Sequence, residues 1–219
     1  FEKYQGAGND FIIIDDRKEN FPDQEHDLIQ KYCDRHFGIG ADGLILVRDS
    51  DLADFKMLSF NAYVLPMSLC GNGSRCVFAF ANKYQMVGNE GTFETSDGIH
   101  KVSITPDDLI CIQMGNVLKI EKRGSAIFMN TGSPHHIEFV NQVSAIDVKT
   151  QGAAIRYGAP YFEVGSNANF VEKVNEKEFN IRTYEIGVED ETLACGTGAV
   201  AAAIGVHFSG QTSLNVLNI

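Results

Sequence analysis

The sequence predicts an α+β protein with two half-sites, because one cysteine motif occurs twice and strand-like segments surround both copies. CGNGSRC at residues 70–76 leads into a helix-like run over 77–84, and ACGTG at 194–198 leads into a second such run over 199–204. The segments between them are short, alternate apolar with polar residues and end at turn-forming residues, which is typical of strands.

In the first half, strands are expected at 1–4 and 11–14, on either side of a glycine-rich turn. The apolar spacing over 23–36 fits a helix, and two apolar runs at 44–47 and 55–60 fit an antiparallel pair of strands. Further strands are expected within 91–102 and at 109–114, 126–130, 166–171, 181–185 and 212–219. Further helices are expected at 147–157 and from the second cysteine to about residue 206.

The position of both cysteines indicates their chemistry. A thiol just before a helix lies in the field of unpaired backbone N–H groups and of the positive end of the helix dipole, which favours the thiolate. The same N–H groups bind carboxylates. Two such turns on opposite faces of one α-carbon would remove a proton from one face and deliver one to the other, which is racemisation or epimerisation without a cofactor.

Four motifs carry a resemblance to a known family. They are QGAGNDF at 5–11, HFGIGADGL at 36–44 and the two cysteine turns, in the family's order and over most of the chain. The chain resembles diaminopimelate epimerase. Proline racemases are similar in using two cysteines, but their first turn usually has His where this chain has Asn72, so the match to the epimerase is the more specific one.

The resemblance implies a fold of two pseudo-symmetric halves, each a curled, mostly antiparallel sheet around a central helix. We place the boundary at the charged turn 121–124, which gives an N-terminal half, 1–123, with Cys70 and a C-terminal half, 124–219, with Cys195. The family continues for several further strands, so the second half is expected to be shortened or incomplete. A homodimer is among the assemblies that the resemblance allows.

The activity implied is cofactor-independent conversion of LL-diaminopimelate to meso-diaminopimelate, in lysine and cell-wall precursor biosynthesis. One of Cys70 and Cys195 acts as the thiolate base while the other, protonated, is the acid. Backbone N–H groups in the two turns bind the substrate and stabilise the negative charge that develops on it. These donors are Gly71, Asn72, Gly196 and Thr197.

Five further side chains match family positions. By resemblance Asn9, Asn61 and Asn167 contact the substrate, and Glu185 is the acidic ligand for its distal ammonium group. Without the resemblance, an Asn that caps its own turn is the simpler interpretation of Asn9. A lone His is more often structural, but His135 matches a family Pro-His pair beside the cysteine site, where an imidazole tunes a thiol pKa.

The chain departs from the family at two places. Tyr63–Pro66 replaces a polar turn of the Asp-Gly-Ser-Glu type, and Ile186 replaces an Arg whose guanidinium forks onto the substrate's distal carboxylate. Arg182 is the nearest cation on the same strand, but it lies about 13 Å along the chain. We therefore expect weak binding of diaminopimelate, and a gain of activity from Ile186→Arg. In addition, Ser133 stands where many members have Asn.

Composition excludes several classes of protein. The chain has 219 residues, of which 44% are hydrophobic and 21% charged, and its formal charge of -11 argues against nucleic acid or an anionic membrane as a partner. A small-molecule amino acid remains as the expected partner. No apolar run approaches the roughly 20 residues of a membrane span, and the N-terminus lacks the regions of a signal peptide, so we expect a cytoplasmic protein.

The cysteines fit reduced thiols, since five is an odd number in a chain of this size. Neither a metal nor a cofactor is expected, because Cys70 and Cys76 are too widely spaced for a short-loop ligand pair and no His pair completes a set. Three alternatives stay open. They are a racemase or epimerase of another amino acid such as proline or hydroxyproline, a thiol redox protein that pairs Cys70 with Cys76, and a non-catalytic small-molecule-binding relative.

Overall fold

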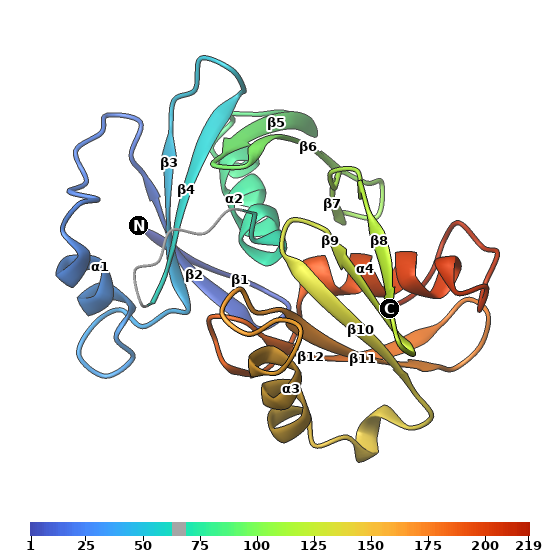
Figure 1. Cartoon of the computed structure of the whole chain (residues 1–219). Coiled ribbons are helices and arrows are strands. Elements are labelled where there is room, and N and C mark those ends of the chain that lie inside the picture. Colours follow the sequence, from blue (N-terminus) through green and yellow to red (C-terminus); the bar gives the residue numbers. More distant parts are fainter. Residues whose placement is uncertain (63–68) are drawn as a thin grey trace. The chain divides into compact units, whose positions relative to one another are not determined.

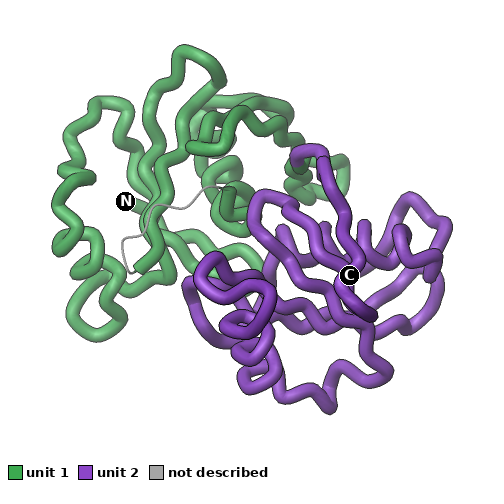
Figure 2. Tube along the Cα trace, viewed as in Figure 1, with its two compact units in different colours: residues 1–114 green, residues 115–219 purple. Residues whose placement is uncertain are grey.

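The computed structural model describes residues 1–62 and 69–219, and the chain forms two compact units, Phe1–Met114 and Gly115–Ile219 (Figure 2). Each unit combines one sheet with one 13-residue helix that begins directly after a cysteine. The altered stretch Tyr63–Pro66 lies outside the described residues.

The described part of the first unit contains a seven-stranded sheet in the sequential order β1 to β7 (Figure 1). Four of its neighbouring pairs are antiparallel, whereas β2 pairs with β3 and β4 with β5 in parallel. The strands are β1 (Glu2–Gly6), β2 (Asn9–Asp15), β3 (Gly43–Arg48), β4 (Phe55–Asn61), β5 (Glu90–Thr95), β6 (Gly98–Ile104) and β7 (Ile110–Ile112).

The sheet of the first unit curls around α2 (Gly71–Lys83). The helix contacts β1 and β2 near one edge of the sheet and β7 at the other edge, which a flat sheet of this width would not allow. Its apolar face, including Val77 and Phe78, packs on Ile45, Phe55 and Phe93 from the inner face of the strands.

The outer face of this sheet is covered by α1 (His26–Cys33), whose Ile29 and Cys33 pack against Leu44 and other apolar residues. The expected helix over 23–36 was too long at both ends. It stops because the Asp34 carboxylate accepts the backbone N–H groups of His36 and Phe37, which bends the chain into a turn.

The described part of the second unit contains a six-stranded sheet in the order β13-β12-β11-β10-β9-β8, in which only the β10–β11 pair is parallel. A short 3₁₀ helix, η1 (Val143–Ala145), follows β10. The strands are β8 (Ile120–Arg123), β9 (Ala126–Asn130), β10 (Pro134–Val140), β11 (Asn167–Lys173), β12 (Phe179–Glu185) and β13 (Asp190–Thr192).

Helices cover the two faces of this second sheet. On one face lies α4 (Gly196–Phe208), which packs with Ile137 and Val171, and on the other lies α3 (Val148–Tyr157), which packs with Phe170 and Tyr184. Because side chains alternate along a strand, the polar residues at odd positions of β11 and β12 share the face of α4. These are Asn167, Asn169, Thr183 and Glu185.

Two expectations about the second half need correction. The division between the units falls after Met114 rather than at 123/124, because β8 pairs with β9 in the second sheet and the turn at 121–124 closes that hairpin. The segment 212–219 forms no strand beyond a single bridge between Asn218 and Glu178. There the Thr212 hydroxyl bonds locally to the backbone N–H of Leu214, which diverts the chain from a ladder.

Candidate functional site

Cys70 is the N-cap residue of α2. Its backbone is extended, its sulfur accepts the N–H of Gly73 at 3.5 Å, and its carbonyl accepts the N–H of Ser74 at 2.7 Å. The glycine-rich stretch expected to be a turn before Val77 is therefore the first turn of the helix itself. The sulfur lies where the first N–H groups of a helix have no intrahelical acceptor and the dipole is positive.

Asn9 faces this sulfur. It is the first residue of β2, and its Oδ1 lies 3.9 Å from Cys70 Sγ. Its Nδ2 donates to Asp42 Oδ2 at 2.8 Å, which fixes the orientation of the amide. The structure thus explains Asn9 by a contact across the sheet rather than by a cap of its own turn.

Hydrogen bonds and ion pairs join the motif at 5–11 to the motif at 36–44 around Asn9. We call this network of Asn9, Asp10, Arg35 and Asp42 the polar lock. Asp42 Oδ2 also accepts the backbone N–H of Asp10, and the backbone N–H of Asp42 donates to the carbonyl of Asp10. The Arg35 guanidinium then bridges the two carboxylates at 2.7 and 2.6 Å. Burial acts to raise the pKa of the Asp10 carboxyl, but hydrogen bonds from Arg35 and Lys3 outweigh it and hold this pKa well below its usual range.

Asn61 and Asn72 lie at the same end of the first unit. Asn61 is the last residue of β4 and stands opposite Gly43, the first residue of β3, at the sheet end where β2 begins with Asn9. Asn72 is in the first turn of α2, is buried, and accepts a hydrogen bond from Arg75 at 2.5 Å. Every candidate site residue of the first half therefore lies at one end of its sheet, together with Cys70.

Cys195 is the N-cap residue of α4 and repeats the arrangement. Its backbone is extended, and its sulfur lies 3.5 Å from Thr197 Oγ1 in the first helical turn. Gly198 is required there, because a Cβ at this position would stand 2.6 Å from Asn169 Oδ1 and 3.2 Å from the Cys195 sulfur. The second cysteine turn is thus also a helix N-terminus packed closely on polar side chains of the sheet.

His135 reaches Cys195 only through Thr197. The imidazole is fully buried, and its Nε2 lies 2.9 Å from Thr197 Oγ1 and 3.0 Å from Ser133 Oγ. Burial lowers the pKa of His135 to about 4, so the ring is neutral. Because Asn169 Nδ2 donates to its Nδ1, the ring proton is on Nε2. Tuning of the thiol by His135 stays a prediction; in the structure the ring contacts the hydroxyl that the thiol also contacts.

Asn167 hydrogen-bonds to the start of β10 and to the residue after β12. Its Nδ2 donates to Ser133 Oγ and to the carbonyl of Pro134, and its Oδ1 accepts the backbone N–H of Ile186 at 2.9 Å. The amide is buried, so these bonds hold it firmly. Its contact with substrate stays a prediction, and its evident work is to align Ser133 and the end of β12.

Glu185 is the last residue of β12. Its carboxyl group accepts the Thr192 hydroxyl at 2.5 Å. Burial raises the pKa of Glu185. Burial and then the charge of Glu185 raise the pKa of Cys195 to about 12, so this cysteine is a thiol at rest despite the helix N-terminus.

Arg182 is not free to bind a ligand. Its guanidinium forks onto Glu191 at 2.6 and 2.7 Å, and its Nη1 donates to two backbone carbonyls, those of Val143 and Ile146. The distance of about 13 Å along the strand already argues against Arg182 as a replacement for the family's Arg at position 186. The structure shows that the side chain is committed to β13 and to the segment before α3.

Two residues of the second half-site were not predicted. Asn169 bonds to His135, and Thr183 donates to Asn169 Oδ1 at 3.0 Å from the neighbouring strand. The available signal was the alternation of β11, since Asn169 is two residues from Asn167 and must share its face. A polar residue on the buried face of a strand is the pattern that would have found it.

The five cysteines, all of which lie within the described residues, form no disulfide in the structure. Cys76 lies in the core against β1 to β5, and burial raises its pKa to about 11. It is six residues beyond Cys70 along α2, which is about 9 Å of helix and beyond the roughly 7 Å limit for a disulfide. This geometry disfavours the redox pair.

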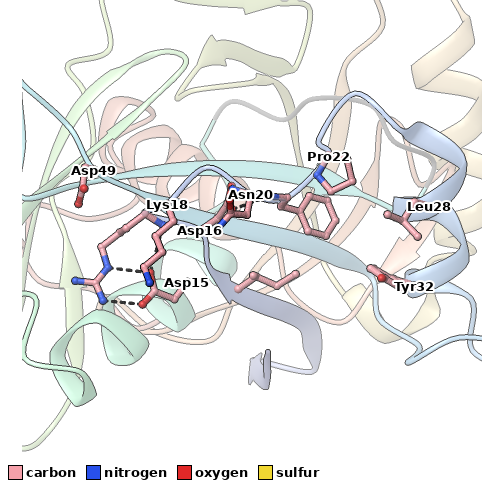
Figure 3. A pocket seen from close by; sticks show the side chains of 11 residues that line it. Asp15, Asp16, Lys18, Asn20, Pro22, Leu28, Tyr32 and Asp49 are labelled. Carbon is pink, nitrogen blue, oxygen red and sulfur yellow. Dashed lines mark hydrogen bonds and ion pairs between the residues drawn. The ribbon is translucent and has the colours of Figure 1, made fainter.

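A surface pocket in the first unit lies away from these side chains. Figure 3 shows it at the end of β2, where Asp15 pairs with Arg17 and the Asp16 carboxylate holds the loop by accepting the N–H groups of Asn20 and Phe21. Asp16 also binds Arg48. The carboxylates of Asp15 and Asp16 are thus engaged in ion pairs and in shaping the loop, and the lining contains no candidate site residue from the described ranges.

Residues 1–62 and 69–219 contain neither a candidate metal site nor a candidate membrane-spanning helix. No group of three or more His, Cys, Asp and Glu side chains in these ranges is arranged to hold a metal ion. No helix in them has the length and apolar character needed to cross a membrane.

The sequence matches the model of a known protein family. The model of the family described as diaminopimelate epimerase matches residues 1–120 and 127–217. The chain is 51% identical to the diaminopimelate epimerase of Flavobacterium psychrophilum over 217 residues, which cover 99% of this chain and 85% of that protein. It is 39% identical to the diaminopimelate epimerase of Aquifex aeolicus, with 100% of this chain and 85% of that protein covered.

Solved structures share the fold at low sequence identity. A Bacillus anthracis phenazine biosynthesis protein of the PhzF family has a TM-score of 0.70 at 15% identity, over 95% of this chain and 77% of that chain. A hydroxyproline epimerase from Agrobacterium vitis, with bound trans-4-hydroxy-L-proline, has a TM-score of 0.65 at 13% identity, over 97% of this chain and 78% of that chain. The predicted fold of two curled, mostly antiparallel sheets is thereby confirmed.

Proposed function

The chain belongs to the diaminopimelate epimerase family, and from this premise we propose that Cys70 and Cys195 are the acid–base pair of its reaction. It is an isomerase that converts LL-diaminopimelate to meso-diaminopimelate, in lysine biosynthesis. The observation that carries the proposal is the repeated geometry. Each unit presents one cysteine as the N-cap of its 13-residue helix.

The surroundings of Cys195 support the acid role that we propose for it in the first direction of reaction. Its pKa is raised to about 12 by burial and by Glu185, so it holds its proton. Cys70 then acts as the thiolate that removes the α-proton, and Cys195 delivers its own proton to the opposite face of the carbon. The reverse reaction starts from the complementary state, with Cys70 protonated and Cys195 as thiolate.

Backbone N–H groups supply the second requirement, which is to stabilise charge. The α-proton of an amino acid is very weakly acidic, so negative charge that develops on the carboxylate must be met by fixed donors. We assign this task to Gly71 and Asn72 at the start of α2 and to Gly196 and Thr197 at the start of α4. Each such donor contributes roughly 3 kcal/mol by analogy with oxyanion holes.

Glu185 remains the proposed acidic ligand for the substrate's distal ammonium group. Its charge also raises the pKa of Cys195, so it influences the proposed acid as well. Asn9, held by Asp42 with its Oδ1 toward Cys70, is the matching polar ligand of the first unit. Asn61 and Asn167 remain candidate substrate ligands at the ends of their strands.

The direct test is a substrate panel. The purified chain is incubated with LL-diaminopimelate, L-proline and trans-4-hydroxy-L-proline, and the stereoisomers are separated on a chiral column. We expect meso-diaminopimelate to form and the two cyclic amino acids to stay unchanged. Turnover of a cyclic amino acid alone would support the racemase alternative, and no turnover of any of the three would support a non-catalytic relative.

The polar lock around Asn9 gives a further prediction. Asp42→Asn should lower kcat/KM about tenfold, because one oxygen of Asp42 can no longer serve both Asn9 and Asp10 while the other serves Arg35. The matched control is Asp15→Asn, which removes a carboxylate paired with an arginine elsewhere on the same sheet. Equal kcat/KM values for the two variants in the same assay would contradict a role of Asp42 in positioning Asn9.

Compartment and assembly stay predictions. We propose that the reaction takes place in the cytoplasm, in keeping with a chain whose described residues contain no membrane-spanning helix. A second copy of this chain is the proposed protein partner, and sedimentation velocity measures whether a homodimer forms.

A further inference from the structure

Resting on the proposed function, we propose that Arg156 binds the carboxylate at the far end of the substrate, the end that is not epimerised. Diaminopimelate carries a second carboxylate, and a guanidinium with paired N–H donors is the side chain best matched to it in a partly dry site. The residue that follows Glu185 on the chain, Ile186, offers none. The cation therefore comes from another element, and α3 provides it.

Arg156 lies in the last turn of α3 and extends to the end of the sheet that carries the second half-site. Its guanidinium and the tip of Ile186 meet over Gly165, which directly precedes β11. A Cβ on Gly165 would stand 2.3 Å from Arg156 Nη1 and 2.7 Å from Ile186 Cδ1. The charge therefore lies beside Ile186, the residue that follows Glu185 at the end of β12.

The guanidinium is held loosely enough to accept a ligand. Its hydrogen bonds are long, with Nε at 3.3 Å from Glu189 Oε1 and Nη1 at 3.4 Å from the Phe162 carbonyl, and its Cζ lies 4.8 Å from the centre of the Tyr157 ring. Its side chain is only 13% exposed, so a bound carboxylate would be shielded from water on most sides. A carboxylate that approaches the two terminal nitrogens would form the forked pair typical of arginine.

Other cations of the second unit are committed or exposed. Arg182 makes short, forked bonds to Glu191, and Arg123 stacks on Phe128 at 3.9 Å from the ring centre. Lys149 is 71% exposed and pairs with Asp190. Among the described residues of this unit, Arg156 combines partial burial, weak contacts and a place beside Ile186.

This placement changes the expectation for Ile186→Arg. A guanidinium introduced at 186 would extend over Gly165 and meet the one that Arg156 already places there. Two like charges in a half-buried site repel each other. We therefore expect no gain of activity on diaminopimelate from Ile186→Arg, contrary to what the sequence alone suggested.

The experiment compares four variants by separate measurement of KM and kcat on LL-diaminopimelate. Arg156→Gln should raise KM by roughly 30-fold or more with little change in kcat, and Arg156→Lys should raise it less. Glu189→Gln removes the other half of the same ion pair but leaves the guanidinium, so its KM should stay equal or fall. Lys149→Gln, on the same helix, is the neutral control.

Inhibition by heptanedioate, a dicarboxylate without amino groups, provides a readout that does not depend on turnover. Its inhibition constant should rise in Arg156→Gln and not in Glu189→Gln. Equal increases in KM and lower thermal stability in both variants would show that the ion pair is only structural and would overturn the proposal. An unchanged KM in Arg156→Gln would also overturn it. An inactive wild-type chain would instead overturn the proposed function on which it rests.

Discussion

Replacement of either Cys70 or Cys195 by serine is expected to lower kcat for epimerisation by about 10³-fold or more. A serine hydroxyl is far too weak an acid to exchange its proton with a substrate carbon near neutral pH, so neither the base step nor the acid step would proceed. The loss should be equally severe in both variants, because each turnover needs one sulfur to take the α-proton and the other to deliver a different proton. The measurement is the initial rate of meso-diaminopimelate formation.

Cys76→Ser is the matched control for this pair. It is on the same helix as Cys70 but is buried in the core, where it supports packing rather than the reaction. We expect nearly normal kcat with a modest loss of thermal stability, since a hydroxyl replaces a thiol among apolar neighbours. If Cys76→Ser were as inactive as the other two variants, the assignment of Cys70 and Cys195 as the acid–base pair would be wrong.

Glu185→Gln is expected to have the second largest effect, a fall in kcat/KM of about 10²- to 10³-fold. The variant removes a buried charge that we assign to the substrate's distal ammonium group, and loss of such a pair typically costs about 2 to 5 kcal/mol. The same change should lower the pKa of Cys195 from about 12, because the negative charge of Glu185 disfavours the thiolate. Alkylation of Cys195 at neutral pH should therefore be faster than in the wild type.

Thr192→Val separates these two effects. It removes the hydroxyl that donates to Glu185 but keeps the carboxyl group beside Cys195. We expect a much smaller fall in kcat/KM and no faster alkylation, measured by mass spectrometry of the labelled peptide. Alkylation of Glu185→Gln at the wild-type rate would contradict the electrostatic coupling between this carboxyl group and the thiol.

Local patterns were sufficient for most of the fold. The two helices after the cysteines, the hairpin strands and α3 follow from apolar periodicity and from glycine, which are properties of neighbouring residues. The errors arose where the outcome depends on distant partners. Whether 212–219 joins a sheet, and whether 121–124 separates two units, depends on which strand lies alongside, and residue spacing does not encode that.

The candidate site divides in the same way. The cysteine turns could be found from sequence because the chemistry needs a thiol at a helix start. The hydrogen bond between Asn9 and Asp42 joins residues 33 apart in the chain, and the effect of Glu185 on the pKa of Cys195 depends on how β12 and α4 pack. Burial decided the ionisation of Cys195, where desolvation outweighs the helix N-terminus, and burial is known only once the sheet and α4 are packed together.

The central claim, that two different cysteines serve the two faces of one α-carbon, is tested most directly by the reaction of LL-diaminopimelate in D₂O at low conversion. With separate bases, the proton removed from the substrate is not the one returned to the product. We therefore predict that the meso-diaminopimelate carries deuterium at its inverted carbon while the remaining LL-diaminopimelate carries none, as measured by mass spectrometry after chiral separation. Deuterium in both isomers at equal levels, or an unlabelled product, would contradict the two-cysteine account.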